Sequence, residues 1–393
     1  MGAAAFMMRR EAVVRQPRWS PWPRGFLMGE DRRYMKRVLA LAERGMGSTA
    51  PNPMVGCVLV KDGEIIAEGW HRAAGEPHAE AEALAIAGDN AYGATAYVTL
   101  EPCNHHGRTP PCAAALVKAG VAEVVYAMAD PHHVAAGGAE YLRHHGVKVR
   151  SGVCEEEATA LNRFWLHTVR TGKPYVIAKF AMSLDGKIAT TSGDSKWITG
   201  PEARERAHQL RRQVDAIIVG AGTVIADDPS LTARDGLEVV GRPLRVVLDS
   251  NGRTPPASAV YDRAGRGALL VATKAALPSR LEAYRTLGVD VVTLDADADG
   301  RPDVADLIMA LRERGANAVM VEGGAETLGS FFDAGLVDEV WAFIAPIIVG
   351  GGKNAVGGHG ATRIAEALKL SNVEIEQIGP DLLIRGFAAR GDR

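Results

Sequence analysis

The sequence predicts an α/β protein with two domains, each built around a largely parallel β-sheet. A chain of 393 residues is longer than one ordinary hydrophobic core organises. Short apolar runs alternate with helical stretches along most of it, as in layered α/β folds. The alternation stops at Gly172, Lys173 and Pro174 before a new apolar run begins. We therefore expect one domain over residues 28–172 and another over residues 173–393.

Residues 1–27 are set apart from this pattern. They carry arginines, prolines and two tryptophans but lack the apolar centre of a secretory signal. We interpret them as a disordered extension, or as an over-extended start whose true first residue is Met28 or Met35.

The elements of the first domain follow from changes in apolar spacing. Residues 32–45 have helical spacing that stops at Gly45, and the apolar run 54–63 ends in a turn and pairs as a hairpin with 64–70. Helices and strands then alternate over residues 76–88, 94–100, 110–120, 122–130 and 139–149.

The second domain shows the same alternation of strands and helices. Apolar runs predict strands over residues 175–183, 215–223, 244–250, 268–273, 289–294, 318–324 and 339–351. Helical spacing appears between them, over residues 201–214 and 303–315. A last pair of strands, over 373–380 and 381–389, closes the chain.

Composition and charge restrict the class of function. The chain is 47% hydrophobic and 23% charged, with a formal charge of −2. Nucleic acids and membrane surfaces favour a strongly basic face, so we expect neither as a partner and expect small-molecule chemistry instead. No run of about eighteen apolar residues predicts a membrane span. The four cysteines are too few and too scattered for a disulfide framework, which favours a reducing cytoplasm.

One constellation in the first domain has the residue types of a zinc site. His78 and Glu80 stand at a predicted helix start, and Cys103 and Cys112 follow a predicted strand. An imidazole and two thiolates are ligands suited to Zn²⁺, and three protein ligands leave a fourth position for the water of a catalytic site. Glu80 is placed to act as general acid and base beside that water. Glu82 has no assigned role.

Each of these residues also has an ordinary structural interpretation. His78 and Glu80 could simply begin a helix, and either cysteine could be a small buried hydrophobe; we read Cys57 as core and Cys154 as incidental. Zinc deaminases show His-x-Glu followed by Pro-Cys-x-x-Cys. Here eight residues separate the two cysteines, so either the site is different or a loop is inserted.

The second domain carries weaker signals for a nucleotide. Gly220 and Gly222 follow one apolar strand, and Gly323 and Gly324 follow another and lead into a helix whose amides could hold a pyrophosphate. Neither turn is a full G-x-G-x-x-G fingerprint, so both could be plain connections. Lys179 lies inside an apolar strand. It is either an active-site residue, or its long side chain carries the charged amine to the edge of the strand.

These motifs together resemble a known family. "GSTAPNPMVGCVLVKDG", "GEPHAEAEAL" and "YVTLEPCNHHGRTPPC" resemble the deaminase domain of the bifunctional riboflavin biosynthesis deaminase/reductases. "SLDGKIAT", "VGAGTVIADDPSLT" and "VEGGAETLGSFF" resemble the reductase domain of the same family, in the same order. The wide spacing of the cysteines is that family's own.

The resemblance implies a cytidine-deaminase-like three-layer α/β/α domain followed by a dihydrofolate-reductase-like α/β domain. The first would hydrolytically deaminate 2,5-diamino-6-(5-phosphoribosylamino)pyrimidin-4(3H)-one with Zn²⁺, and the second would use NADPH to reduce the ribosyl group to ribityl. The phosphorylated pyrimidine is thus the expected partner, and a homo-oligomer is expected.

The resemblance also implies roles for individual residues, namely those that stand at matching positions of the family's motifs. Zinc falls on His78, Cys103 and Cys112, with Glu80 as the proton carrier, and deaminase substrate contacts fall on Asn52, His71, His105 and Arg108. NADPH contacts fall on Ala181, Trp197, Thr223, Asp227, Ser250, Gly324, Ala325, Glu326, Thr327, Leu328, Gly329 and Ser330. Reductase substrate contacts fall on Ser195, Arg211, Leu231, Arg234 and Glu322, the arginines as phosphate ligands. Lys179 is a further candidate.

The chain also departs from the family, and other hypotheses stay open. His132 and His133 replace an expected Asn-Pro, which leaves any ligand contact of that loop unassigned. One alternative is a zinc deaminase of another base, nucleoside or tRNA, with the second half as a binding module; the lack of a basic patch argues against tRNA. The other is a structural zinc domain, although such sites normally have a fourth protein ligand.

Overall fold

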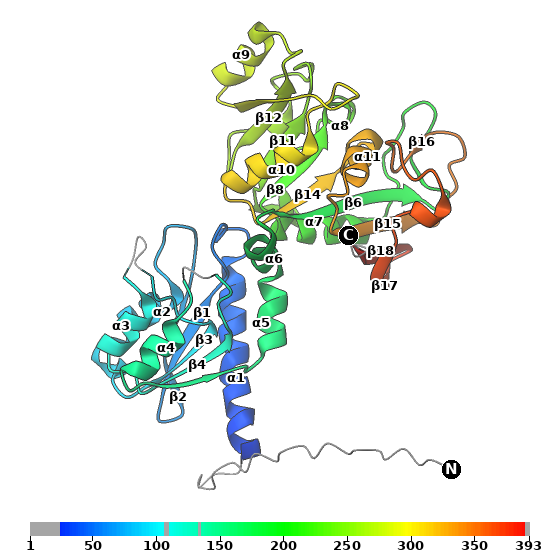
Figure 1. Cartoon of the computed structure of the whole chain (residues 1–393). Coiled ribbons are helices and arrows are strands. Elements are labelled where there is room, and N and C mark those ends of the chain that lie inside the picture. The colour runs from blue at the N-terminus through cyan, green and yellow to red at the C-terminus, as the bar shows by residue number, and fades with distance from the viewer. Residues whose placement is uncertain (1–23, 106–109, 133–134, 390–393) are drawn as a thin grey trace, which may run out of the picture.

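The structure, a computed structural model, describes residues 24–105, 110–132 and 135–389. Within these ranges the chain forms a five-stranded sheet in its first part and a nine-stranded sheet in its second (Figure 1). Helix α6 lies at the junction between the two parts. The predicted α/β class is confirmed.

The five-stranded sheet has the order β2-β1-β3-β4-β5. The strands span Gly56–Lys61 (β1), Glu64–Trp70 (β2), Thr95–Leu100 (β3), Glu123–Met128 (β4) and Lys148–Ser151 (β5). β1 pairs antiparallel with both β2 and β3, whereas β3-β4 and β4-β5 are parallel. The expectation of a largely parallel first sheet is therefore wrong, because β1 lies between β2 and β3 and runs opposite to both.

Helices cover both faces of this sheet and make three layers. They span Arg24–Ala42 (α1), Ala79–Ala87 (α2), Cys112–Lys118 (α3), Gly138–His144 (α4), Glu155–Leu161 (α5) and Arg163–Thr171 (α6), with short 3₁₀ turns at Glu43–Gly45 and Gly88–Ala91. On one face, alanines of α2 and Leu116 and Leu142 of α3 and α4 pack on Leu59 and Val98. On the other, α1, α5 and α6 pack on the strands.

Helix α1 begins earlier than the sequence analysis expects. It starts at Arg24, within the segment 1–27 that we interpret as an extension, and residues 1–23 lie outside the described residues. Met35, proposed as a possible start, is fully buried against the sheet.

The nine-stranded sheet has the order β13-β12-β11-β8-β14-β6-β15-β18-β17. All pairs from β13 to β15 are parallel, and β18 and β17 add an antiparallel edge. The strands span Tyr175–Ser183 (β6), Ala216–Gly220 (β8), Leu244–Leu248 (β11), Ala268–Thr273 (β12), Asp290–Leu294 (β13), Ala318–Glu322 (β14), Glu339–Ala345 (β15), Leu370–Ile378 (β17) and Asp381–Ala388 (β18). This sheet matches the predicted largely parallel arrangement.

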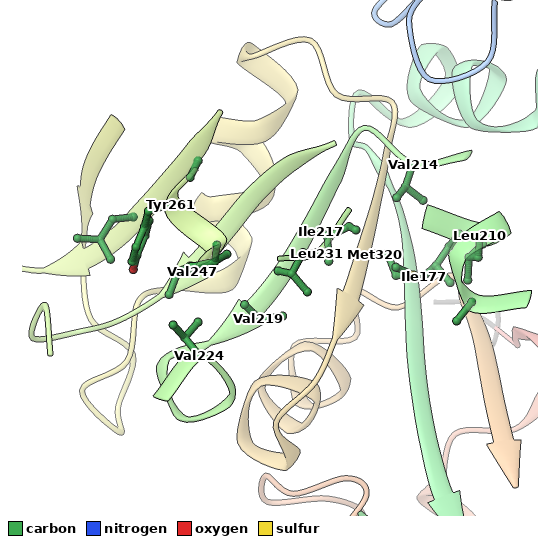
Figure 2. Packing of buried hydrophobic residues seen from close by; sticks show 14 of the residues in the cluster. Ile177, Leu210, Val214, Ile217, Val219, Val224, Leu231, Val247, Tyr261 and Met320 are labelled. Atoms are coloured by element: carbon green, nitrogen blue, oxygen red, sulfur yellow. The ribbon is translucent and has the colours of Figure 1, made fainter. Parts of the chain in front are cut away.

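Helices also cover both faces of the second sheet. They span Pro201–Gln213 (α7), Ala221–Asp227 (α8), Pro278–Thr286 (α9), Val304–Glu313 (α10) and Ala325–Asp333 (α11), with 3₁₀ turns at Ala259–Tyr261 and Ile364–Glu366. Figure 2 shows one face, where Leu210 of α7 and Val224 of α8 pack with Ile217, Val247 and Met320 of the strands. Helices α10 and α11 pack on the opposite face.

Two small strand pairs lie outside the main sheets. Ala233–Asp235 (β9) pairs with Glu238–Gly241 (β10), and Lys187–Ala189 (β7) pairs with Lys353–Asn354 (β16). The strand predicted over 215–223 ends at Gly220, where α8 begins. In the part of the chain that the structure describes, no helix is both long enough and apolar enough to cross a membrane.

Candidate metal centre and nucleotide pocket

Three candidate zinc ligands converge at the start of two helices. His78 is the N-cap of α2, Cys103 lies just after β3, and Cys112 is the first residue of α3. One ligand atom from each lies within 4.8 Å of the others. The His78 Nδ1 atom is 3.2 Å from Cys112 Sγ and 3.6 Å from Cys103 Sγ. Ligands of a tetrahedral zinc lie roughly 3.5 Å apart, so this donor set fits Zn²⁺ in both chemistry and spacing.

The His78 imidazole does not serve as a helix cap. Although its backbone occupies the N-cap position of α2, its side chain makes no capping hydrogen bond. It faces the two thiols instead, which favours the ligand interpretation over the helix-start alternative.

The thiol pair is polarised by its surroundings. Hydrogen bonding from Cys112, together with His78, lowers the pKa of Cys103 to about 4. The same hydrogen bond to Cys103 raises the pKa of Cys112 well above its usual value. A cysteine that is a thiolate near neutral pH is a ready metal ligand.

Glu80 lies in the first turn of α2, beside these ligands, and is buried. Burial, with a further contribution from the Cys103 charge, raises the pKa of Glu80 to about 7. A carboxyl group with this pKa can both accept and release a proton at neutral pH. Glu82, by contrast, accepts hydrogen bonds from Arg72 and from the Trp70 backbone amide, which gives it a structural role.

Asn52 and His71 lie together next to the metal ligands. The His71 Nδ1 atom is 3.0 Å from the Pro77 carbonyl oxygen, so Nδ1 carries the proton and donates. The Nε2 atom then accepts a hydrogen bond from Asn52 Nδ2 at 3.1 Å. Burial lowers the pKa of His71, which keeps the ring neutral. Both ring nitrogens thus have partners inside the protein, and His71 orients Asn52.

The loop between the cysteines is described only in part. His105 is half-buried, and its Nδ1 atom is buried without a hydrogen-bond partner among the described residues. Arg108 lies outside the described residues. His133 does as well, whereas the His132 backbone amide donates to Asp130 Oδ1 at 2.8 Å.

Sequence reasoning missed the residues that support the Cys103 segment. Glu101 accepts hydrogen bonds from the backbone amides of Ala139 and Asp130. A Cβ added at Gly138 would lie 1.7 Å from the Pro102 carbonyl oxygen, so only glycine allows α4 to lie this close to the segment that carries Cys103. The place of Glu101, two residues before Cys103, is the one signal that could have identified it.

The second domain has a large cavity at the carboxyl ends of its central strands. Its volume is about 1170 Å³. It is lined by all the reductase residues predicted from the sequence except Arg234 and Gly329. Arg234, on β9, donates to Thr232 Oγ1, and Gly329 packs against the backbone of Gly357 and Gly358.

Three charged side chains meet in this cavity. Glu322, at the end of β14, accepts hydrogen bonds from Arg211 Nε and Nη2, each at 2.8 Å, and from Lys179 Nζ at 2.9 Å. Burial alone would raise the pKa of Glu322, but the charges of Arg211 and Lys179 outweigh it and hold that pKa well below the usual range. The sequence suggested phosphate as the partner of Arg211, whereas the structure pairs its guanidinium with Glu322.

The two glycine turns lie side by side, because β8 and β14 are parallel neighbours. A Cβ on Gly220, at the end of β8, would lie 2.5 Å from Thr327 Oγ1 of α11. Gly323 and Gly324 have φ angles of +119° and +73°, which glycine adopts readily. The first turn of α11 lines the cavity. The first backbone amides of a helix have no partner within the helix, so this arrangement is suited to a pyrophosphate.

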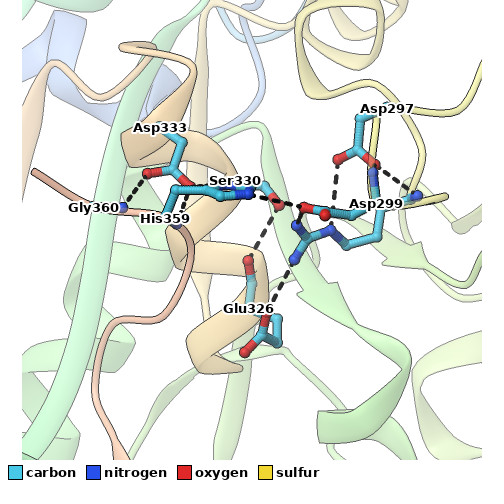
Figure 3. A network of polar contacts seen from close by, with 8 residues as sticks. Asp297, Asp299, Glu326, Ser330, Asp333, His359 and Gly360 are labelled. Atoms are coloured by element: carbon cyan, nitrogen blue, oxygen red, sulfur yellow. Dashed lines mark hydrogen bonds and ion pairs between the residues drawn. The ribbon is translucent and has the colours of Figure 1, made fainter. Parts of the chain in front are cut away.

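A network of polar contacts lies next to the Gly323–Gly324 turn and the first turn of α11. Arg301, on the loop before α10, pairs with Asp297, Asp299 and Glu326. Figure 3 shows how this network reaches along α11 to Asp333, which accepts hydrogen bonds from the backbone amides of His359 and Gly360. It joins two loops to the helix that borders the cavity.

Both parts of the chain match families of known proteins. Residues 28–128 match the family described as the cytidine and deoxycytidylate deaminase zinc-binding region, and residues 174–384 match the RibD C-terminal domain. The riboflavin biosynthesis protein RibD of Actinobacillus pleuropneumoniae is 45% identical over 89% of this chain and 93% of its own length. That of Escherichia coli is 42% identical over 90% of this chain and 98% of its own length.

Solved structures agree with these matches. Acinetobacter baumannii RibD is 39% identical, covers 92% of this chain with all of its own, and superposes with a TM-score of 0.81. A diaminohydroxyphosphoribosylaminopyrimidine deaminase/5-amino-6-(5-phosphoribosylamino)uracil reductase from Thermotoga maritima is 36% identical over the same shares, with a TM-score of 0.77.

Proposed function

The chain belongs to the RibD family of riboflavin biosynthesis proteins, and from this premise we propose how its residues divide two consecutive reactions. It is a bifunctional enzyme with zinc and NADPH as cofactors. It hydrolytically deaminates 2,5-diamino-6-(5-phosphoribosylamino)pyrimidin-4(3H)-one to 5-amino-6-(5-phosphoribosylamino)uracil, and then reduces the ribosyl group of that product to ribityl.

The deaminase reaction is assigned to the first domain, residues 28–172. His78, Cys103 and Cys112 hold the zinc. When bound, the metal supplies a water whose pKa is lowered to roughly 7. Glu80 takes a proton from the attacking water and delivers it to the departing amine, so that water and the amine become a carbonyl group and ammonia. The observation that carries this assignment is the buried Glu80 carboxyl in the first turn of α2, beside three converging ligands.

Substrate contact in the deaminase is assigned to Asn52, with His71 holding it in place. The orphaned Nδ1 atom of His105 supports a further contact, because a buried polar atom without a partner in the described protein suits a ligand atom. Arg108 is also proposed as a substrate contact, on the basis of the family resemblance.

The reductase reaction is assigned to the second domain, residues 173–393. The Gly323–Gly324 turn and the amino end of α11 would hold the pyrophosphate of NADPH, and Lys179 and Glu322 would face the substrate. The protein's task is to place the nicotinamide against the reactive sugar carbon. Glu322 accepts a hydrogen bond from Lys179 and so orients it, and Arg211 helps to keep Glu322 ionised. Lys179 is therefore the candidate to supply the proton that the reduced sugar takes up.

Assembly and compartment are also part of the proposal. We propose a homo-oligomer, because the edge strand β17 exposes Val373 and Ile375, and nearby Ile364 is 92% exposed. Unpaired strand edges with apolar side chains favour association. We propose the cytoplasm as its compartment, because all four cysteines are free thiols.

One incubation tests the proposed function. Purified protein is given the diaminopyrimidine substrate with and without NADPH, and ammonia and NADPH oxidation are followed together. We expect ammonia in both cases and NADPH oxidation only after ammonia appears. NADPH oxidation without ammonia release, or no ammonia at all, would contradict the proposal.

A further inference from the structure

A short loop of the deaminase, residues 50–54, lies against the reductase domain and is held by it. We propose that Asn317, a residue of the reductase domain, is a positioning residue for the deaminase: it holds Pro51 and thereby sets the place of Asn52. The inference rests on the proposed function, in which Asn52 contacts the pyrimidine.

Two side chains of the second domain contact this loop. Asn317 Nδ2 donates to the Pro51 carbonyl oxygen at 3.2 Å. Arg266 Nη2 donates to the Ala50 carbonyl oxygen at 3.4 Å. The loop segment that leads directly into Asn52 is therefore anchored from outside its own domain.

Asn317 is buried and its backbone is held by hydrogen bonds, although its Oδ1 atom has no partner among the described residues. It is 5% exposed, and its backbone amide donates to Asp215 Oδ2 at 2.8 Å. Its carbonyl oxygen accepts from the Tyr175 amide at 2.8 Å and from Thr168 Oγ1 at 3.2 Å. Asp215 in turn pairs with Arg266 at 3.3 Å. A support held this firmly can hold the loop in one place.

From Pro51 the contacts continue to the metal ligands. Asn52 donates to His71, and His71 donates to the Pro77 carbonyl oxygen, which directly precedes His78. On the far side of Asn52, the amide of Met54 donates to Asn162 Oδ1 at 2.8 Å and its carbonyl accepts from Asn162 Nδ2 at 3.0 Å. Asn52 is thus the centre of a loop that is anchored at both ends.

The reductase site is remote from this support. Asn317 and Asp215 directly precede β14 and β8, at their amino ends, whereas Glu322 and Gly220 lie at the carboxyl ends of the same strands. Glu322 lies five positions along the strand from Asn317, or roughly 16 Å away. Loss of the Asn317 side chain therefore leaves the contacts of the reductase cavity in place.

This geometry leads to an unusual expectation. A substitution in the reductase domain should damage the deaminase reaction and spare the reductase reaction. A residue with only a structural role would harm the domain that contains it at least as much as its neighbour.

The test uses the full-length protein with Asn317→Asp, which keeps the size of the side chain but replaces the donor with a carboxylate oxygen. Ammonia release from the diaminopyrimidine and NADPH oxidation with the deaminated pyrimidine are measured separately. We expect kcat/KM for ammonia release to fall about fivefold to tenfold, mainly through KM, and the reductase values to stay within about twofold. Asn90→Ala, an exposed asparagine of the first domain, is the matched control.

Two further variants keep the test decisive. In an Asn52→Ala background, Asn317→Asp should have no added effect, because Asn317 acts through Asn52. If Asn317→Asp does not fold, Arg266→Gln removes the contact with Ala50 at a more exposed position and should produce the same selective loss. Unchanged ammonia release, equal loss of both activities, or additive effects with Asn52→Ala would overturn the proposal. Failure of the unsubstituted protein to release ammonia would instead overturn the proposed function.

Discussion

The guanidinium of Arg211 donates two parallel hydrogen bonds to the carboxylate of Glu322, a residue 111 positions later in the chain. Both distances are 2.8 Å, and Lys179 adds a third contact to the same carboxylate at 2.9 Å. The triad lies in the cavity where both glycine turns end. It joins helix α7, strand β6 and strand β14 at one point, so its members should act as a unit.

Arg211→Ala should abolish most of the reductase activity and destabilise its domain. Removal of Arg211 takes two charged hydrogen bonds from the buried Glu322 carboxylate and leaves Lys179 as its remaining charged partner, at a cost of about 3 kcal/mol. We expect NADPH oxidation to fall about a hundredfold and ammonia release to stay near normal. Arg212→Ala, at the exposed neighbouring arginine, is the control. Equal loss of both activities would argue against separate sites.

Stability of the reductase domain should depend on pH through Glu322. Its pKa is held below the ordinary value of 4.5 in the folded protein, so the folded state binds fewer protons than the unfolded state. The stabilisation is therefore complete above pH 4.5 and is lost as the pH falls further. Thermal unfolding from pH 7 to pH 3 should show this loss in the unsubstituted protein and a flatter dependence in Glu322→Gln. Parallel curves for the two proteins would contradict the assignment.

Removal of zinc should stop the first reaction and spare the second. Cys103→Ser replaces a thiolate with a poorer ligand, so we expect metal analysis to find less than one zinc per chain and ammonia release to fall by at least about a hundredfold. NADPH oxidation with the deaminated pyrimidine should continue. Cys57→Ser, a buried cysteine outside the ligand set, should retain zinc.

Gly323→Ala should weaken cofactor binding. The residue has a φ of +119°, and an added Cβ would lie 3.2 Å from Thr223 Oγ1, so the turn must shift away from its present geometry. We expect NADPH to bind about tenfold more weakly in a fluorescence titration. Gly335→Ala also places a side chain at a positive φ, +63°, at the other end of α11, with open space around it. It should bind NADPH normally; equal weakening in both variants would point to general strain.

Local patterns were sufficient to predict much of the fold. The strands over 175–183 and 268–273 have the predicted bounds, because continuous apolar runs between turns leave little choice. The hairpin of β1 and β2 was predicted correctly, but the antiparallel pairing of β1 with β3 was missed, because a hairpin does not show which strand lies on the other side of β1. The small strands β7 and β16 were missed because they pair across more than 160 residues of chain.

The candidate site was predictable where its residues share a motif. His78 and Glu80 are two positions apart, and Cys103 and Cys112 follow the next strand, so their spacing predicted the group that the structure assembles. The support of the site was not predictable in this way. Asn317 contacts Pro51 across 266 positions, and Arg211 meets Glu322 only because α7 packs beside β14. Contacts of this kind depend on the packing of whole domains, which no local pattern records.

The measurement that tests the central claim most directly is ammonia release by Glu80→Gln, with zinc content and NADPH oxidation determined on the same sample. Glutamine keeps the shape of the side chain but cannot carry the proton. The account predicts a normal zinc content, normal NADPH oxidation with the deaminated pyrimidine, and ammonia release reduced by at least about a thousandfold. Ammonia release close to that of the unsubstituted protein would contradict it.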